Sequence, residues 1–378
     1  MSLSIQKKDL FELLQKSFPI IPLKSSLQIL SNFKLSYNGT IFEISATDLD
    51  HFIRVYTNIN GSKSCQITVN ARRLFEIVRE LPDGLVELDL HENVLIIRSE
   101  KGFSCKIAGA DVRDFPGFPE EGNYPSISLS SVTLKDIITK GSFAVAKDES
   151  RAVLCGVFFE VNQNKIGMVS TDGHRLGYSF YNDSFPIDTL FNCVISPKSL
   201  LNLSRIFDNK NDENVTVKIS EKYIVFSTHN FIMYSKLLEG PYPDYLKVIP
   251  KNNPKKAVID RNILQIAVKR VSVLSNQKTH LVKFSFLKNS LEIVVINRDI
   301  GGEAREEISV VYEYDNHTIG FNSQYLLEIL EIIKSEKILL EMNTQISACL
   351  IYPFLKENEK LNSDDLFLIM PLRILEDV

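Results

Sequence analysis

Apolar residues at helical spacing recur in three similar segments of the chain. The segments read VNARRLFEIVRELPDG, ISPKSLLNLSRIFDN and FNSQYLLEILEIIKS. In each, a residue that favours a helix N-cap follows the first apolar residue, and apolar residues then recur every three or four positions. The three expected caps stand 126 residues apart twice over and are Asn70, Ser196 and Asn322. This spacing indicates three copies of one unit.

Each unit also contains an earlier helix and two sets of alternating strands. The first helices are expected at 6–17, 131–141 and 260–271, and the second at 70–80, 196–207 and 322–334. Alternating apolar and polar residues follow each helix, which is typical of half-buried strands. Asn38-Gly39, Gln163-Asn164 and Lys288-Asn289 are expected to form hairpin turns between strands. The pattern predicts an α+β fold in which every unit packs two helices on antiparallel sheets of about eight strands.

Two proline-rich segments separate the units. Residues 111–127 contain three prolines and residues 239–256 contain four, out of 14 in the chain. Proline disfavours regular structure, so both segments are expected to be extended connectors. We therefore predict three domains of similar size, at 1–126, 127–254 and 255–378.

The composition is that of a globular protein, with 44% apolar and 24% charged residues. No run of about 18 apolar residues is present, which predicts no membrane span. The amphipathic N-terminus lacks the apolar core of an export signal. The five cysteines are never closer than 38 residues, so free thiols in a reducing cytoplasm are expected. A cytoplasmic protein without a metal or other cofactor is the prediction.

Charge is distributed unevenly along the chain. The net charge is −4, but the six predicted helices carry 14 basic and 8 acidic side chains. One interpretation is that helices simply tolerate long basic side chains. The other is that the helices share a face whose positive charge attracts a polyanion such as DNA, without reading its sequence. No zinc-finger spacing, RNP-like motif or basic zipper is present to read bases.

The segment STDGHRLG, at residues 170–177, resembles a catalytic loop at first sight. Asp172, His174 and Arg175 could serve acid–base chemistry, but the sequence offers no nearby second carboxylate or metal set. Related segments at 46–55 and 296–305 lack the Gly-His-Arg combination. We therefore favour a turn in which Asp172, like Asp48 in the first unit, bonds backbone amides. The turn would then present His174 and Arg175 to a partner.

The chain resembles the family of bacterial sliding clamps, the β subunits of DNA polymerase III. The resemblance covers nearly the whole length. It is carried by TDGHRL at 171–176, PYPDYLKVIPKN at 241–252, IGFNSQYLLEIL at 319–330 and IMPLR at 369–373. The VNARRLFEIVRELPDG segment adds support in the first domain.

The resemblance implies a head-to-tail homodimer closed into a ring, with helices lining the hole and sheets outside. Such a ring holds double-stranded DNA topologically and performs no chemistry. It implies a processivity factor that tethers the catalytic subunit of DNA polymerase III, with the clamp loader, other polymerases and repair proteins as further partners. Residues 1–126 of one subunit would meet residues 255–378 of the other.

The resemblance also implies two sets of functional residues. Partners would insert a short apolar peptide into a cleft between the second and third domains. The expected cleft residues are Leu154, Thr171, Gly173, His174, Arg175, Leu176, Pro243, Lys247, Val248, Asn322, Tyr325, Ile346, Ala348, Ile369, Met370, Pro371, Leu372 and Arg373. The expected DNA-facing residues are Lys24, Arg72, Arg73, Lys198, Arg205, Lys269 and Arg270.

Three positions depart from the family pattern. Gln28 stands where a proline is frequent, and Lys247 where an arginine is common, which removes bidentate hydrogen bonding there. The chain also continues five residues beyond Arg373 as ILEDV. This acidic tail could discourage acidic peptides if it lies beside the cleft.

Two other functions are compatible with parts of the pattern. A metal-independent hydrolase would use His174 and Asp172. A repeat protein that scaffolds other proteins without DNA would share the threefold architecture, but not the pairing of IMPLR with TDGHRL.

Overall fold

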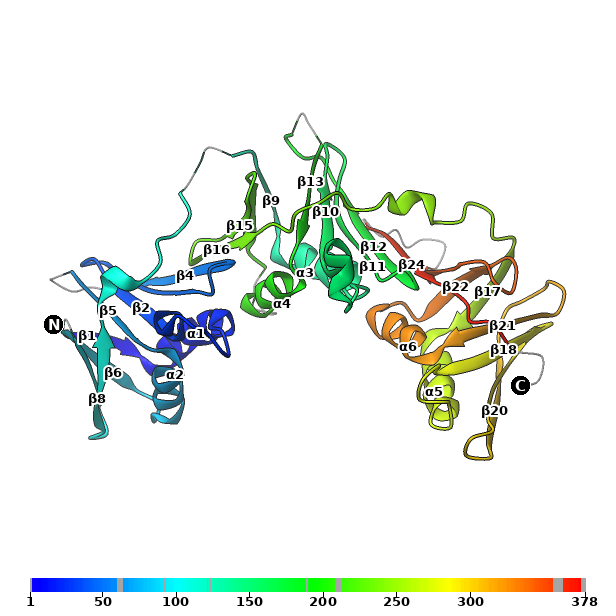
Figure 1. The fold of residues 1–378 in the computed structure, drawn as a ribbon, viewed down its shortest axis with the longest axis horizontal. Coiled ribbons are helices and arrows are strands. Elements are labelled where there is room, and N and C mark those ends of the chain that lie inside the picture. Colours follow the sequence, from blue (N-terminus) through cyan, green and yellow to red (C-terminus); the bar gives the residue numbers. More distant parts are fainter. Residues whose placement is uncertain are drawn as a thin grey trace. The chain divides into compact units, whose positions relative to one another are not determined.

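The computed structural model describes residues 2–59, 64–91, 93–120, 122, 124–187, 190–207, 212–355 and 363–374 (Figure 1). Within these residues the chain forms six α-helices and 24 strands. The three repeats each contribute two helices and eight strands, in the order strand, helix, four strands, helix, three strands. The prediction of an α+β unit repeated three times is confirmed.

The first repeat comprises β1 (Ser2–Gln6), α1 (Lys7–Ser17), β2 (Asn32–Tyr37), β3 (Ile41–Thr47), β4 (His51–Asn58), β5 (Cys65–Asn70), α2 (Ala71–Glu80), β6 (Leu85–His91), β7 (Val94–Ser99) and β8 (Ser104–Ala110). The second comprises β9 (Ser126–Ser130), α3 (Ser131–Gly141), β10 (Val157–Val161), β11 (Lys165–Thr171), β12 (Arg175–Asn182), β13 (Phe191–Ile195), α4 (Pro197–Ile206), β14 (Asn214–Ile219), β15 (Tyr223–Ser227) and β16 (Phe231–Lys236). The third comprises β17 (Lys255–Asp260), α5 (Arg261–Ser272), β18 (Leu281–Leu287), β19 (Ser290–Asn297), β20 (Gly302–Ser309), β21 (His317–Asn322), α6 (Ser323–Ile332), β22 (Lys337–Met342), β23 (Cys349–Phe354) and β24 (Ser363–Ile369).

Short 3-10 helices interrupt the connections between these elements. They are η1 (Phe18–Ile20), η2 (Gln28–Ser31), η3 (Val112–Asp114), η4 (Glu149–Cys155) and η5 (Tyr245–Lys247). η3 and η5 lie in the two proline-rich segments. The other described residues of these segments contain no helix and only the ends of strands.

Helix boundaries follow from local capping. The side chain of Asn70 accepts a hydrogen bond from the amide of Arg73 at 3.0 Å, and α2 begins directly after Asn70. Asn322 accepts from the amides of Gln324 and Tyr325 at the start of α6. These bonds satisfy amides that have no partner within the helix, which is why both helices begin there.

Contacts group the chain into two compact units. The first unit contains residues 1–135 and 198–237, and the second contains residues 136–197 and 238–378. The first unit has a 12-stranded sheet in the order β1-β6-β7-β8-β5-β2-β3-β4-β16-β15-β14-β9. The second has an eight-stranded sheet, β13-β10-β11-β12-β24-β23-β22-β17, and a four-stranded sheet, β20-β19-β18-β21. The second repeat therefore contributes to both units, and the domain boundaries at 126/127 and 254/255 stay predictions.

Neighbouring repeats are joined by antiparallel strand pairs. In the first unit β4 pairs with β16, with Phe52 opposite Tyr234. In the second unit β12 pairs with β24, with Leu176 opposite Leu368. The fourth strand of one repeat is thus covered by the last strand of the next, which removes an exposed sheet edge at each junction.

The helices cover one face of these sheets. In the first unit α1 and α2 lie side by side (Figure 1), and Phe11 of α1 contacts Phe75 of α2 with ring centroids 5.3 Å apart. In the second unit, α5 and α6 pack through a core that includes Leu264, Val268 and Leu326. Each helix buries one stripe and leaves the other in solvent, as amphipathic spacing predicts.

A buried charge cluster fixes β24 against α3 in the second unit. The ammonium group of Lys140 donates to the carboxylate of Asp365 at 2.7 Å and also bonds that of Asp136. The hydroxyl of Ser179 donates to the other oxygen of Asp365 at 2.6 Å. Burial opposes the charge on Lys140, but the two carboxylates outweigh it and raise the pKa of Lys140. Lys334 pairs with Asp136 at 3.1 Å as well, so two ammonium groups balance the two carboxylates. Such pairing is what allows ionised groups to persist when they are buried.

Candidate functional site

The TDGHRL segment forms the turn between β11 and β12. The carboxylate of Asp172 accepts hydrogen bonds from the amides of His174 and Arg175 at 2.9 and 3.0 Å. The hydroxyl of Thr171 accepts from the amide of Gly173 and donates to the carbonyl of Arg175. Gly173 has φ of +87°, a conformation that glycine adopts without strain. The predicted role of Asp172 as a turn former is confirmed.

The first unit contains a second copy of this turn, between β3 and β4. The carboxylate of Asp48 accepts from the amides of Asp50 and His51 at 3.2 and 2.7 Å. Burial raises the pKa of Asp48, but bonds and charge from His51 and a bond from Lys198 outweigh it and lower the pKa to about 2. Asp48 is therefore also a turn former, as predicted.

The side chain of Arg175 is buried and engaged within the chain. Its Nε donates to the carboxylate of Asp172 at 3.1 Å, and a terminal nitrogen bonds the carboxylate of Glu328 on α6. Its guanidinium lies 4.4 Å from the ring centroid of Tyr325 and 5.4 Å from that of Phe143. With only 5% of its surface exposed, Arg175 holds the turn against α6 rather than projecting from it.

The tail after β24 is bonded to the same turn. The amide of Met370 donates to the carbonyl of His174 at 2.7 Å, and the amide of Leu372 donates to the carbonyl of Gly320 at 2.8 Å. Met370, Pro371 and Leu372 are half-buried, and Arg373 is exposed. The exposed His174 stacks on Tyr325, with centroids 6.5 Å apart. The turn, α6 and the tail are therefore brought together.

An apolar cluster lies beside the turn, on the face of the sheet away from the helices. Leu176, Val169, Leu350 and Leu368 are buried in it, and Ala348 and Met370 pack against it. Tyr245, in the proline-rich connector at 239–256, covers one part of this cluster. Its burial there raises the pKa of its hydroxyl group. We call residues 171–176, 243–248 and 370–373 the turn-and-tail surface.

The other predicted residues differ in exposure. Pro243, Lys247 and Val248 are exposed on the connector, where Lys247 pairs with Asp244 at 3.1 Å. Ile346 is exposed in the turn before β23. Asn322 is occupied as the cap of α6. Ile369, by contrast, is fully buried in the core of the third repeat and faces away from the turn-and-tail surface.

Leu154 differs from its expected place. Among the predicted cleft residues it is the one that the family resemblance places on the strand next to the TDGHRL turn. It lies half-buried in the 3-10 helix η4 instead, before β10 begins. The carbonyl of Leu154 accepts from the amide of Ala146, so this segment closes a loop instead of joining the sheet.

Two residues near the turn escaped the sequence analysis. An ideal Cβ at Gly173 would lie 3.4 Å from a guanidinium nitrogen of Arg151, which places that exposed side chain over the turn. Glu328 bonds Arg175 across 153 positions of sequence. No local pattern marks either residue, because both act through contacts distant in sequence.

The predicted DNA-facing residues are all exposed, but they differ in their ion pairs. Lys198 pairs with Asp48 at 2.5 Å, and Arg270 pairs with Glu306, so part of their charge is neutralised. Arg205 lines a groove of about 530 Å³ together with Lys16 of α1. Lys24 lies in the loop between η1 and η2, Arg72 and Arg73 on α2, and Lys269 on α5.

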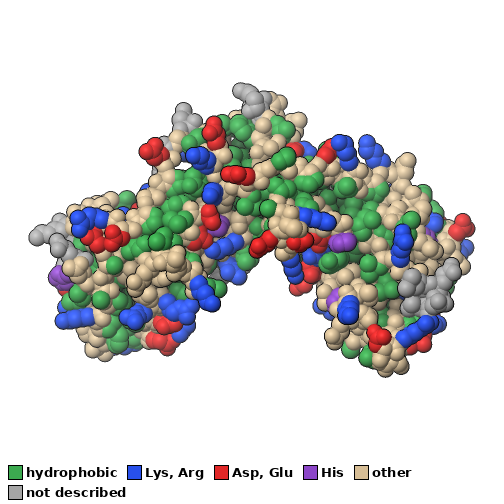
Figure 2. All heavy atoms as spheres, viewed as in Figure 1, with side chains coloured by type: hydrophobic (Ala, Val, Ile, Leu, Met, Phe, Trp, Pro, Cys, Tyr) green, Lys and Arg blue, Asp and Glu red, His purple; other side chains and the backbone are tan. Residues whose placement is uncertain are grey.

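Basic side chains gather over the helices of the first unit. Figure 2 shows Lys and Arg around α1, α2 and α4. Over their observed bounds the six α-helices contain 13 basic and 7 acidic residues, although α6 contains no basic residue. The six helices are thus more basic than the remainder of an acidic chain.

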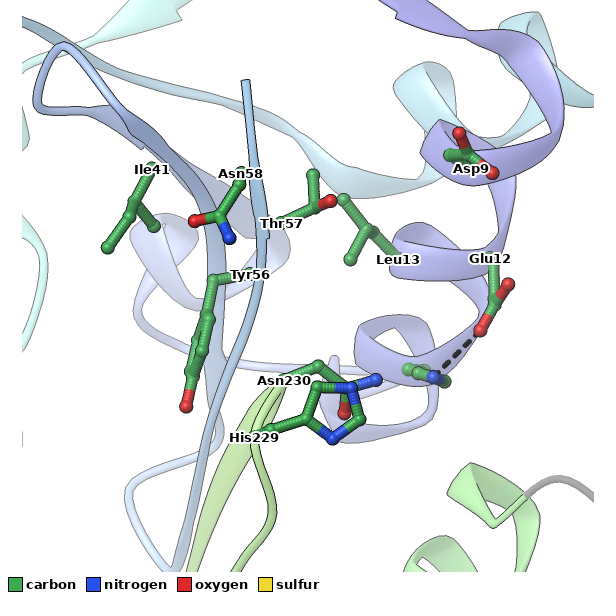
Figure 3. A pocket seen from close by; sticks show the side chains of 10 residues that line it. Asp9, Glu12, Leu13, Ile41, Tyr56, Thr57, Asn58, His229 and Asn230 are labelled. Carbon is green, nitrogen blue, oxygen red and sulfur yellow. Dashed lines mark ion pairs between the residues drawn. The ribbon is translucent and has the colours of Figure 1, made fainter. Parts of the chain in front are cut away.

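A separate hollow in the first unit contains none of the predicted residues. It has a volume of about 310 Å³ and lies between α1, β4 and the turn after β15. Figure 3 shows His229 and Asn230 from that turn facing α1, where Lys16 pairs with Glu12 at 2.8 Å. Most of its lining residues are polar or charged, which does not suit an apolar peptide.

The described residues offer no set of metal ligands. No group of three or more His, Cys, Asp and Glu side chains gathers in them, and all five cysteines are free. None of the helices in the described part of the chain combines the length and apolar character needed to cross a membrane.

Comparison with known proteins identifies the family. Models of the DNA polymerase III beta subunit match in sequence order: the N-terminal domain at residues 1–119, the central domain at 128–244 and the C-terminal domain at 246–373. The beta sliding clamp of Pseudomonas aeruginosa is 30% identical over 376 residues, covering 99% of this chain and all of the relative. The chain belongs to the family of bacterial β sliding clamps.

Solved structures agree with this assignment. The Bacillus subtilis sliding clamp matches with a TM-score of 0.90 at 28% identity, over 99% of this chain and all of that one. The Pseudomonas aeruginosa clamp bound to griselimycin matches with a TM-score of 0.91 at 28% identity and the same coverage. The protein is therefore a DNA sliding clamp, a component of DNA replication.

We predict that Arg175→Gln destabilises the protein by about 2–4 kcal/mol, because it leaves the carboxylates of Asp172 and Glu328 without their buried partner. Arg151→Gln is the matched control. That arginine is exposed, so its replacement should change the free energy of unfolding by less than about 0.5 kcal/mol. Urea unfolding of both variants measures the difference, and equal effects would contradict a structural role for Arg175.

Proposed function

We propose that two copies of the chain pair head-to-tail into a closed ring around duplex DNA. The strand pairs within one chain support this arrangement. β4 is covered by β16 and β12 by β24, each from the next repeat. The equivalent third junction requires β20 of the third repeat and β8 of a first repeat. Among the described residues β20 pairs only with β19.

The repeats also specify a register for that junction. The fourth strands β4, β12 and β20 can be aligned through their pairing with β3, β11 and β19, respectively. In this alignment Phe52, Leu176 and Gly302 occupy equivalent positions. The last strands β8, β16 and β24 can be aligned in the same way through their pairing with β7, β15 and β23. In this alignment Lys106, Tyr234 and Leu368 occupy equivalent positions. Phe52 faces Tyr234 and Leu176 faces Leu368. Gly302 should therefore face Lys106 of a second copy, which sets Glu303 opposite Cys105.

Side-chain chemistry is compatible with that junction. β20 reads GEAREEIS and is acidic, whereas β8 reads SCKIAGA and follows the exposed Lys101. Ile300, 63% exposed, and Phe103, 41% exposed, lie next to these strands and would be covered on pairing. Opposite charge at the edges would favour the heterologous contact over pairing of like strands.

The substitution Glu303→Cys tests the register. Residues directly opposite in an antiparallel pair have Cα atoms about 4.5–5.5 Å apart, which suits a disulfide. We expect mild oxidation to join Glu303→Cys to the native Cys105 of a second copy, yielding a covalent dimer on a non-reducing gel. Arg305→Cys, placed opposite Phe103, should form little dimer. Adding Cys105→Ser to Glu303→Cys should abolish the product, and cross-linking that persists would contradict the register.

The basic helical surface would meet the DNA. Phosphate attraction is independent of sequence and weakens with salt. Arg72, Arg73, Arg205 and Lys269 would contribute most, because Lys198 and Arg270 already have acidic partners. Enclosure rather than tight contact would retain the DNA, so the modest excess of positive charge is sufficient.

The protein would act without chemistry of its own, in the cytoplasm where bacterial DNA is replicated. The carboxylate of Asp172 and the guanidinium of Arg175 are both used to build the turn. Within the described part of the chain, His174 therefore has no charged catalytic partner. This arrangement favours a processivity factor over a hydrolase.

Partners would bind the turn-and-tail surface with short apolar peptides. Half-buried apolar side chains next to a few exposed polar groups are typical of a peptide site. Met370 and Val248 would contact the apolar residues, with the buried Leu176 supporting them from beneath, and His174 and Arg373 would orient the peptide. The polymerase III catalytic subunit, the clamp loader, other polymerases and repair proteins would share this site. The tail at 375–378 lies outside the described residues.

Griselimycin provides a probe, because the Pseudomonas aeruginosa and Bartonella birtlesii clamps have been solved with it. We expect this chain to bind it at the turn-and-tail surface, and Val248→Glu to weaken binding at least tenfold. The matched control is Val311→Glu, since both valines are 57% exposed. Isothermal titration calorimetry gives both affinities. Unchanged binding by Val248→Glu would contradict this placement of the site.

A further inference from the structure

The apolar face of the eight-stranded sheet extends past the turn-and-tail surface. Tyr178 lies two residues beyond Leu176 on β12 and pairs with Leu366, two residues before Leu368 on β24. Tyr352 lies two residues beyond Leu350 on β23. Side chains two apart on a strand share a face. These side chains all pack against the same apolar cluster as Leu176 and Met370, so the two regions are continuous.

A pocket of about 540 Å³ opens at this end of the face. Tyr178, Tyr352, Pro353 and Leu366 give it apolar and aromatic walls, and Asp364 and Asp365 contribute carboxylates. The carboxylate of Asp365 is bonded to Lys140 and Ser179 within the chain. Asp364 is exposed, and no ion pair or hydrogen bond of its side chain occurs within the described residues. Asp364 is therefore the carboxylate available to a ligand.

The pocket lies in a negative environment. Burial raises the pKa of Tyr178 to about 12, and the carboxylates of Asp364 and Glu160 add to the shift. Burial raises the pKa of Tyr352 to about 12 as well, with Glu341 adding to it. Both tyrosines thus sense nearby negative charge, which would repel an anionic ligand and attract a cation.

On the same sheet face, one cation of the chain already lies between aromatic rings and a carboxylate. The ammonium of Lys165 lies 4.2 Å from the ring centroid of Phe180 and 5.9 Å from that of Tyr178, and it pairs with Glu160 at 3.8 Å. An aromatic face with an adjacent carboxylate is a favourable site for an ammonium or guanidinium group. Tyr352 and Asp364 provide the same combination on the other side of Tyr178's contact with Lys165, and neither of them has a cation of its own among the described residues.

We propose that this pocket binds a lysine or arginine side chain in the segment flanking a partner's apolar clamp-binding peptide. The proposal rests on the function proposed above, because the apolar part of the peptide must occupy the turn-and-tail surface. Met370, the first residue after β24, is four residues from Leu366 on that strand. The separation is about 13 Å at roughly 3.3 Å per extended residue. An extended peptide therefore reaches the pocket with a basic residue about four positions from its apolar anchor.

Matched peptides test the proposal on the full-length protein. The probes are fluorescein-labelled synthetic peptides that share an apolar Leu- and Phe-containing core. They carry Lys, Gln or Glu four positions before or after it. We expect Lys on one side to tighten binding about three- to fivefold relative to Gln at low salt, and Glu to weaken it. Fluorescence anisotropy measures each affinity.

Two variants decide whether the pocket causes this preference. Asp364→Asn should remove the gain from Lys, whereas Glu313→Gln, which removes an exposed carboxylate elsewhere in the second unit, should retain it. A gain that survives Asp364→Asn, or that falls equally in both variants, would overturn the proposal. The Gln-flanked peptide reports the turn-and-tail surface separately. If that peptide fails to bind the unsubstituted protein, the proposed function fails rather than the pocket.

Discussion

The pairing of strand edges determines the architecture of this protein. An uncovered edge exposes unpaired amides and carbonyls, which bind further strands. Each repeat ends its first set of strands in such an edge, and the next repeat covers it, as β16 covers β4 and β24 covers β12. The repeats are therefore not self-contained, and the contact units of the chain divide the second repeat between them. Of the three equivalent edges, that of β20 has no cover among the described residues, and a strand of the proposed partner subunit would cover it.

The same junction creates the turn-and-tail surface. Pairing of β12 with β24 places the TDGHRL turn next to the tail, and Arg175 fixes the turn to α6 through Glu328. A group that appeared catalytic in the sequence is thus used to position the proposed binding surface. Aromatic and acidic side chains continue along the sheet from this surface, which would allow one partner to bind both through its apolar peptide and through the residues that flank it.

Local patterns predicted the elements of the fold well. The six helices begin and end within two residues of the predicted positions, since their N-caps and apolar stripes are local features. Residue roles that depend on distant partners were not visible. Arg270 pairs with Glu306 and Lys198 pairs with Asp48, which neutralises part of the positive charge of these two residues. The sequence alone does not show these ion pairs. Strand register at the chain end turns Ile369 into the core, and the loop before β10 keeps Leu154 out of the sheet.

Enclosure of DNA is the central claim, and retention on circular DNA tests it most directly. The labelled protein is loaded onto nicked circular DNA by a clamp loader, separated from free protein, and the DNA is then cut once. Enclosure predicts that the protein stays on the circle at salt concentrations that abolish phosphate attraction and leaves through the ends after cutting. Equal retention on cut and uncut DNA, or loss from the intact circle with rising salt, would contradict it.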